Sequence, residues 1–117
     1  VLTKPAGTPP WTGSVYAIVY NLTFADTTKR DQMKNDIDTW LVGKEEWGIG
    51  GDAKSHTQSG NDDYLIVRLV SQDDMDALLS FIEEKIASIP AISGRVAKHW
   101  CGHQIQKQCE EIEVITV

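Results

Sequence analysis

Residues 63–92 read DYLIVRLVSQDDMDALLSFIEEKIASIPAI, and this stretch predicts a strand that leads directly into a helix. The run 64–70 is apolar and rich in β-forming residues, so it predicts a strand buried on both faces. Ser71 offers a hydroxyl as N-cap, and Asp73 and Asp74 follow in the first turn, where the helix dipole favours carboxylates. The rest of the chain can be folded around this pair of elements.

The predicted helix has one apolar side, and Pro90 ends it because proline cannot continue a helix. Its apolar residues recur at steps of three and four: Met75, Leu78, Leu79, Ile82, Ile86 and Ile89. An amphipathic helix of this kind is typical of a layer that covers one face of a sheet.

The flanking segments predict the remaining elements. A strand is expected over 15–24, a weak strand in the second half of 47–60, a fourth strand over 95–105 and a last one over 112–117. A second helix is expected after Asp26, with an apolar stripe and with Gly43 as its C-cap. The stripe consists of Met33, Ile37, Trp40 and Leu41. The order β-α-β-β-α-β plus an extra strand predicts an α+β fold, the ferredoxin-like plait, with both helices on one face of an antiparallel sheet.

Length and charge limit the classes of function. The 117 residues are expected to form one domain over 14–117, preceded by an extended N-terminal arm, 1–13, that holds three prolines and two glycines. A net charge of −6 repels phosphate backbones and anionic membranes, so we expect neither a nucleic-acid nor a membrane partner. The chain begins at Val1 and has two cysteines, which favours secretion, with a cytoplasmic protein as the alternative.

The two best-defined strands are apolar on both sides. One side shows Tyr16, Ile18, Tyr20 and Leu22, and the other shows Tyr64, Ile66 and Val70. An antiparallel sheet with helices on one face normally alternates apolar and polar residues, because its free face meets water. A second apolar face must be covered, most simply by another copy of the chain, so we expect a homodimer.

Residues 60–96 resemble the effector-binding half of the Lrp/AsnC regulators. In that family a Gly and an Asp precede a buried strand, an acidic helix follows, and an "ipGV" turn leads to the last strand. The matching positions are Gly60, Asp63, Ile89, Pro90, Ala91 and Ile92, with Ala91 where the family usually has Gly. The wider dimeric α+β-barrel group, in which two plaits pack sheet to sheet, fits equally well. The resemblance implies a plait domain, and without a preceding helix-turn-helix it does not imply a DNA-binding regulator.

A ligand site is expected between the two facing sheets. Its candidate residues are Tyr16, Tyr20, Asn21, Tyr64 and Arg68. An arginine among tyrosines can clamp a carboxylate or stack on a planar group, so the expected ligand is small and apolar or a carboxylate. The alternative is that Arg68 pairs with a carboxylate of the partner copy.

The segment HWCGH places His99, Cys101 and His103 at alternating positions, which makes them weak candidates for a soft-metal site. Their spacing matches no established zinc motif, so no metal or other cofactor is expected. Cys101 and Cys109 are expected to form a disulfide, with two free thiols as the alternative.

These patterns predict a non-enzymatic homodimer that binds a ligand or a protein, in the manner of a small secreted effector or signalling protein. The competing hypothesis is a cofactor-independent monooxygenase or isomerase with its site inside a dimeric barrel. An enzyme of that kind needs an acid or base aimed into the cavity. We assign no catalytic residue, because the candidates on this face form no convincing acid–base pair.

Overall fold

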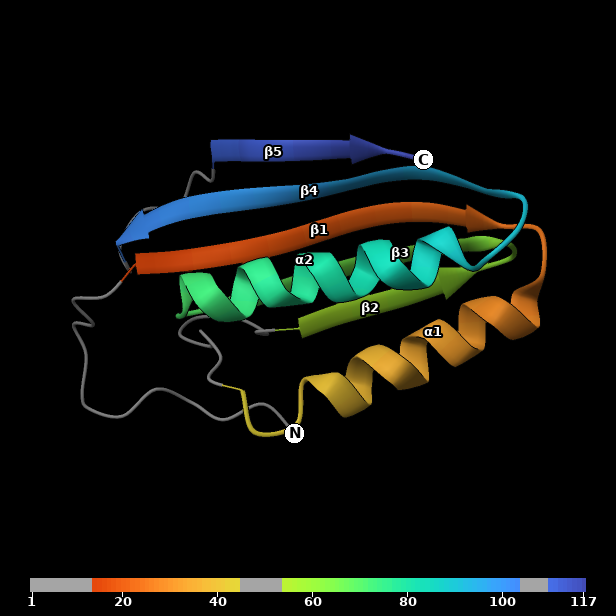
Figure 1. Ribbon diagram of the computed structural model, residues 1–117, viewed down its shortest axis with the longest axis horizontal. Helices are drawn as coiled ribbons and strands as arrows, with labels where there is room; N and C mark the ends of the chain where they lie inside the picture. The colour runs from red at the N-terminus through yellow and green to blue at the C-terminus, as the bar shows by residue number, and fades with distance from the viewer. Residues whose placement is uncertain (1–13, 45–53, 104–109) are drawn as a thin grey trace.

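The computed structural model describes residues 14–44, 54–103 and 110–117, and it confirms an α+β fold with two helices and an antiparallel sheet (Figure 1). The elements are β1 (Ser14–Phe24), α1 (Thr27–Trp40), β2 (Lys54–Ser59), β3 (Asp62–Leu69), α2 (Gln72–Ala87), β4 (Ile92–His103) and β5 (Glu110–Thr116). They occur in the predicted order, and most bounds differ from the expected ones by one to three residues.

The sheet has five strands in the order β2-β3-β1-β4-β5, with β1 in the centre. β1 pairs antiparallel with β3 on one side and with β4 on the other, and β2 and β5 form the two edges. β2 and β3 are joined by a tight turn at Gly60 and Asn61, where Gly60 has a φ of +59°. The turn confirms the predicted break at this glycine.

The N-caps of both helices follow the sequence closely, whereas the C-cap of α1 is Leu41 and not the predicted Gly43. Asp26 is the N-cap of α1 and accepts a hydrogen bond of 2.9 Å from the backbone N–H of Thr28. Ser71 is the N-cap of α2 and accepts one of 3.2 Å from the N–H of Asp74, as predicted. Both caps use a side-chain oxygen to satisfy a backbone donor that the first turn leaves unpaired.

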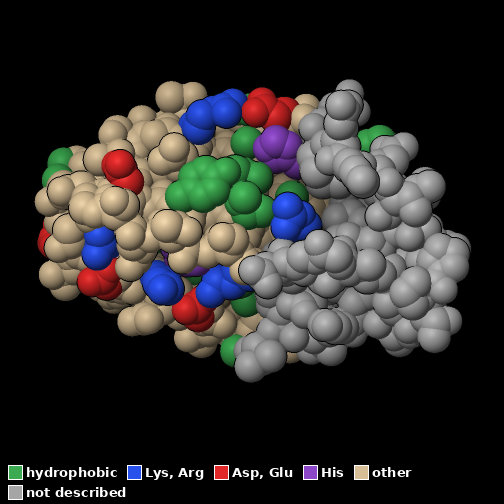
Figure 2. Space-filling view, turned by 180° about the vertical axis from the view of Figure 1, so that it is seen from behind, with side chains coloured by type: hydrophobic (Ala, Val, Ile, Leu, Met, Phe, Trp, Pro, Cys, Tyr) green, Lys and Arg blue, Asp and Glu red, His purple; other side chains and the backbone are tan. Residues whose placement is uncertain are grey.

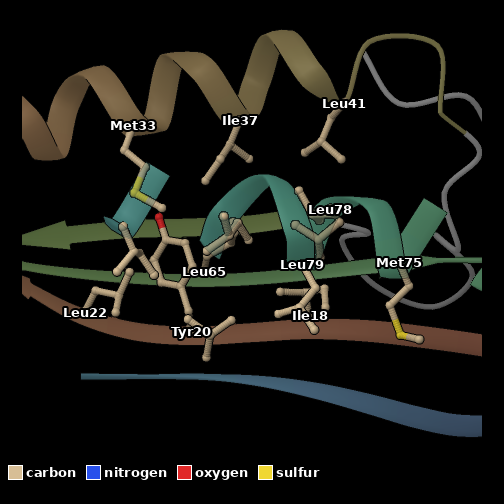
Figure 3. Close-up of a cluster of buried hydrophobic side chains, with 14 of the residues drawn as sticks. Ile18, Tyr20, Leu22, Met33, Ile37, Leu41, Leu65, Met75, Leu78 and Leu79 are labelled. Atoms are coloured by element: carbon tan, nitrogen blue, oxygen red, sulfur yellow. The ribbon is translucent and has the colours of Figure 1, made fainter. Parts of the chain in front are cut away.

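The core lies between the sheet and the two helices, which cover the same face (Figure 3). Even-numbered residues of β1 and odd-numbered residues of β3 point toward the helices, because side chains alternate along a strand. The buried apolar set includes Ile18, Tyr20, Leu22, Phe24, Met33, Ile37, Leu41, Leu65, Val67, Leu69, Met75, Leu78, Leu79, Ile82 and Val96. The predicted apolar stripes of both helices supply most of the helix side of this core.

The prediction that strand 64–70 is buried on both faces is confirmed for the helix side only, and for the other face it stays a prediction that depends on a second copy. Leu65, Val67 and Leu69 are fully buried against the helices. On the other face Tyr64 is 40% exposed, and Ile66 is only half-buried. A sheet covered by helices on one side leaves the second face open within a single chain, so the strand alternates in burial.

Gly94 allows β1 and β4 to approach each other closely. A Cβ atom at this position would overlap the backbone carbonyl oxygen of Asn21, and Gly94 has a φ of +133°. Both facts require glycine here.

The expected N-terminal arm, 1–13, lies outside the described residues, as does the segment 104–109. Within the described part of the chain, neither helix is both long enough and apolar enough to cross a membrane.

Candidate functional site

The face of the sheet that the helices leave uncovered, called here the open face, has a row of apolar residues across four strands. Ile66 of β3 lies opposite Val19 of β1, Val19 lies opposite Ala97 of β4, and Ala97 lies opposite Val114 of β5. Directly opposite residues share a face, so these four side chains form one band, called here the apolar row. Val114 at its β5 end is 39% exposed.

Polar and charged residues border the apolar row on both sides. On one side Tyr64, Asn21 and Arg95 lie opposite one another on β3, β1 and β4. On the other side the equivalent line is Arg68, Ala17, His99 and Glu111. Figure 2 views the molecule from behind the sheet and shows apolar side chains in the middle of the described surface with charged and histidine side chains around them. The open face is therefore a narrow apolar band with a polar border.

The structure places three of the five predicted ligand-binding residues on the open face, with Arg68 on the opposite border of the apolar row from Asn21 and Tyr64. Asn21 and Tyr64 are directly opposite on the open face, and Arg68 lies on the same face of β3. Tyr16 and Tyr20 point to the other side and pack in or against the helix-side core. The prediction treated residues of opposite parity as one set, which the alternation of β1 does not permit.

A second polar group lies inside the core, where Tyr20, His56 and Asp63 meet; it is called here the polar network. The Tyr20 hydroxyl donates to Asp63 Oδ2 at 2.5 Å and lies 3.1 Å from His56 Nε2. His56 Nε2 lies 2.9 Å from Asp63 Oδ1 and 3.0 Å from Oδ2. The His56 side chain is 2% exposed and that of Asp63 is 0% exposed. These three side chains come from β1, β2 and β3 and join the strands beneath α1.

The surroundings of Tyr20 strongly favour its neutral form. Burial raises the pKa of Tyr20 well above its usual range, because a phenolate there would lose its hydration. The hydrogen bond to Asp63, the negative charge of Asp63 and the charge of Asp38 raise this pKa further. Tyr20 therefore acts as a hydrogen-bond donor to the carboxylate.

The polar network is closed to solvent, so it is suited to holding protons in place and not to acting on a substrate. General acid–base catalysis needs a group within hydrogen-bond reach of the reacting molecule. Two buried side-chain nitrogens on β2, His56 Nδ1 and Gln58 Nε2, find no hydrogen-bond partner among the described residues. Near them Lys54 pairs with Asp38 of α1.

The sequence analysis missed His56 and Asp63 as interacting residues. Asp63 alternates with Leu65, Val67 and Leu69, which places it on the buried side of β3. The tight turn at Gly60 then sets the register of β2 and carries His56 to the same side. Alternation and the turn were therefore the available signals, although the contact with Tyr20 also requires the β1–β3 register.

The structure tests the HWCGH segment only in part. His99 lies on the open face between Ala17 and Glu111. Cys101 and His103 belong to β4, but their side chains are not among those described, and Cys109 lies in the undescribed segment. No group of three or more His, Cys, Asp or Glu side chains is placed to hold a metal ion in the described part. The disulfide stays a prediction.

A shallow groove runs between α1 and α2 on the outer side of the molecule. Its lining consists of Lys29, Gln32, Met33, Asp36, Lys85, Ser88 and Ile89. Lys85 already pairs with Asp36 at 3.4 Å. The volume of about 100 Å³ is well below the 300–1,000 Å³ of ordinary ligand pockets, so the groove is a poor ligand site.

Comparison with known proteins gives no family assignment, since no family model, curated protein or solved structure matches the chain.

Proposed function

We propose that the chain is a ferredoxin-like plait that acts by binding, as a homodimer whose two open faces pack against each other in the manner of the dimeric α+β-barrel group. The observation that carries the proposal is the apolar row. Its members lie opposite one another on β3, β1, β4 and β5, and although Ala97 is only 2% exposed, Val114 is 39% exposed and Ile66 is half-buried. Exposed apolar side chains of this kind are poorly solvated by water.

The strand order supports the plait. Its first four strands in sequence, β1 to β4, occupy the sheet in the order β2-β3-β1-β4, with α1 and α2 on the same face. This is the arrangement expected for a β-α-β-β-α-β plait in which the first and third strands are central. β5 adds to the β4 edge and widens the open face by one strand.

The apolar row suits a two-fold dimer. A two-fold axis between the sheets and parallel to the strands, placed between β1 and β4, lays β3 of one copy over β5 of the other. Ile66 then meets Val114 of the second copy, and Val19 meets Ala97, so each large side chain opposes a smaller one. The same axis lays Arg68 over Glu111 of the second copy, a carboxylate that pairs with Arg95 of its own chain at 3.2 Å, so opposite charges face each other at the border.

Sedimentation equilibrium at micromolar concentration tests the dimer. Wild type is expected at twice the monomer mass, and Ile66→Asp is expected at the monomer mass, because a carboxylate in the apolar row would be buried without a partner. Val42→Asp is the matched control, since Val42 lies in the turn just after α1 and is 62% exposed. A folded wild-type monomer, or loss of the dimer in the control as well, would refute a dimer built through the open face.

The proposed ligand is small and apolar or a carboxylate, and it binds on the open face with its carboxylate at Arg68 and its apolar part over Ile66, toward Tyr64 and Asn21 on the opposite border. Titration with benzoate as the probe, followed by amide chemical shifts, is expected to perturb the β1 and β3 residues of the open face. Arg68→Met is expected to abolish the perturbation and Arg95→Met to preserve it. Shifts that persist in Arg68→Met would contradict this placement.

A role as a secreted effector or signalling protein remains part of the proposal. The competing enzymatic hypothesis has less support, because the strongest acid–base group in the described part of the chain, the polar network, is enclosed by the core.

A further inference from the structure

The outer edge of β5 is the most apolar exposed feature of the described surface. Of the five large apolar side chains that are well exposed in the described residues, three belong to β5 or to the residue after it: Ile112 at 53%, Val114 at 39% and Val117 at 37%. The other edge strand, β2, has the sequence KSHTQS and no apolar residue. Among the described strands β5 pairs only with β4, so its outer edge is open (Figure 1).

The hydrogen bonds between β5 and β4 determine which backbone groups face this open edge. Val117 donates its N–H to the carbonyl oxygen of Gly94 at 2.9 Å, so these two residues form a hydrogen-bonded pair. In an antiparallel ladder such pairs alternate with pairs that are not hydrogen-bonded. The N–H and C=O groups of every second residue back to Glu113 therefore point to β4, whereas those of Val114 and Thr116 point away from the sheet.

β5 lacks most of the features that protect an edge strand from pairing. Exposed edges are commonly blocked by proline, by lysine or by a bulge. β5 has neither proline nor lysine, and the shift in its register with β4 lies between Lys98 and His99, opposite the first part of β5. Residues 113–117 stay in regular register with β4. Another extended chain can add to this segment as a strand.

The charges beside the open edge indicate the chemistry of such a chain. On the helix side the ammonium of Lys98 lies 2.7 Å from Asp76 and 3.7 Å from Glu113, so one positive charge faces two carboxylates. On the open face Arg95 and Glu111 balance each other at 3.2 Å. The edge of β5 therefore has excess negative charge on its helix side and an apolar side chain, Val114, on its open side.

From these observations we propose that the outer edge of β5 binds an extended segment of a partner protein, in which basic and apolar residues alternate, as a sixth strand of the sheet. The segment runs antiparallel to β5, which is the more stable pairing. Its basic side chains lie beside Glu113, its apolar side chains lie beside Val114, and its backbone pairs with the outward groups of Val114 and Thr116.

A second copy of β5 suits this edge less well, because it would bring a further excess of negative charge to the helix side. The proposed dimer buries a face of the sheet and leaves this edge open, so the partner site does not depend on the dimer. Ile66→Asp, which is expected to break the dimer, is expected to retain the partner site.

Titration of the full chain with the peptide acetyl-KVKVKV-amide, followed by amide chemical shifts, tests the site. We expect the amides of Val114 and Thr116 to shift and those of β2, the other edge, to stay unchanged. The charge-reversed peptide acetyl-EVEVEV-amide is expected to bind about tenfold more weakly, because each reversed pair of exposed charges changes the affinity by a small factor.

Methylation of the peptide backbone separates strand addition from a general attraction between opposite charges. In the proposed register the valines lie opposite Val114 and Thr116, so their N–H groups donate to β5, whereas the N–H groups of the lysines point away from it. The peptide with methylated valine nitrogens is expected to show no binding at millimolar concentration. The peptide with methylated lysine nitrogens is expected to bind like the unmodified one.

Thr116→Pro is the decisive variant of the protein. It removes an N–H that faces the open edge and leaves the hydrogen bonds with β4 in place, so it is expected to abolish binding of the peptide. Thr116→Val keeps this N–H and is the matched control, expected to bind like wild type.

Four results would overturn the proposal. They are no binding at millimolar peptide, equal binding of the two methylated peptides, binding that Thr116→Pro retains, and equal affinity for the charge-reversed peptide. Assemblies of wild type larger than a dimer that Thr116→Pro reduces to dimers would assign the edge to a second copy of the chain instead.

Discussion

Tyr20→Phe removes one hydroxyl from the polar network and leaves the packing of the ring in place. The lost hydrogen bond joins a neutral donor to a buried carboxylate at 2.5 Å. Hydrogen bonds to charged groups contribute about 1.5–3 kcal/mol, and His56 remains as the second donor to Asp63. We therefore expect the variant to be destabilised by about 2 kcal/mol, without a cavity term.

The measurement is urea unfolding followed by tryptophan fluorescence and circular dichroism. The midpoint is expected to fall with the m-value unchanged, and the thermal midpoint is expected to drop by roughly 8 °C for a domain of this length. Tyr16→Phe is the matched control. Tyr16 lies on the same side of β1, and no side-chain hydrogen bond involves it within the described part of the chain. It is expected to change stability by less than about 0.5 kcal/mol.

A double-mutant cycle with Asp63→Asn isolates the contact from the rest of the network. The coupling between positions 20 and 63 is expected to be about 1–2 kcal/mol. Equal stabilities for Tyr20→Phe and Tyr16→Phe, or a coupling near zero, would show that the polar network does not hold the three strands together.

Three further predictions concern other parts of the chain. The pKa of Tyr20 is raised in the folded protein, whereas the unfolded chain releases this phenol proton near pH 10, so the stability that Tyr20 contributes is fully present below pH 10 and is lost as the pH rises above it. Absorbance at 295 nm should show Tyr20 ionising only when the protein unfolds, and ionisation of Tyr20 in the native protein would contradict this. Gly94→Ala should lower the free energy of unfolding in urea by about 3 kcal/mol or more, because the added Cβ would overlap the β1 backbone. Gly60→Ala should lower it by only about 1–2 kcal/mol, because that position has a left-handed φ but open space around it; equal losses for the two variants would contradict the close approach of β1 and β4. Cys101 and Cys109 should resist alkylation until they are reduced, and intact mass showing two alkylated thiols in unreduced native protein would exclude the bridge.

The local part of the fold could be predicted from sequence because its causes are local. Ser71 and Asp26 cap helices through contacts two or three residues away, and the helix stripes repeat at the period of the helix itself. The position of Gly60 at the β2–β3 turn is equally local. These signals need no knowledge of which strands lie side by side.

The candidate sites depended on longer-range information. Tyr20 and Asn21 are consecutive residues of β1, so their side chains point to opposite faces of the sheet and cannot line one site. The alternation of side chains along a strand was enough to exclude this grouping. The contact of Tyr20 with His56 spans 36 residues and depends on two strand registers at once. No pattern in the neighbourhood of either residue specifies those registers, so the polar network could not be found by reading along the chain.

The central position of β1 has a consequence for the time course of folding. Its partners are far away in sequence: Thr23 pairs with Asp62, 39 residues later, and Tyr16 pairs with Trp100, 84 residues later. During synthesis the most apolar strand leaves the ribosome early and has no neighbour until β3 and then β4 follow. Non-local pairing of this kind slows folding, so we expect the apolar side chains of β1 to stay exposed in the nascent chain for longer than the small size of the domain suggests.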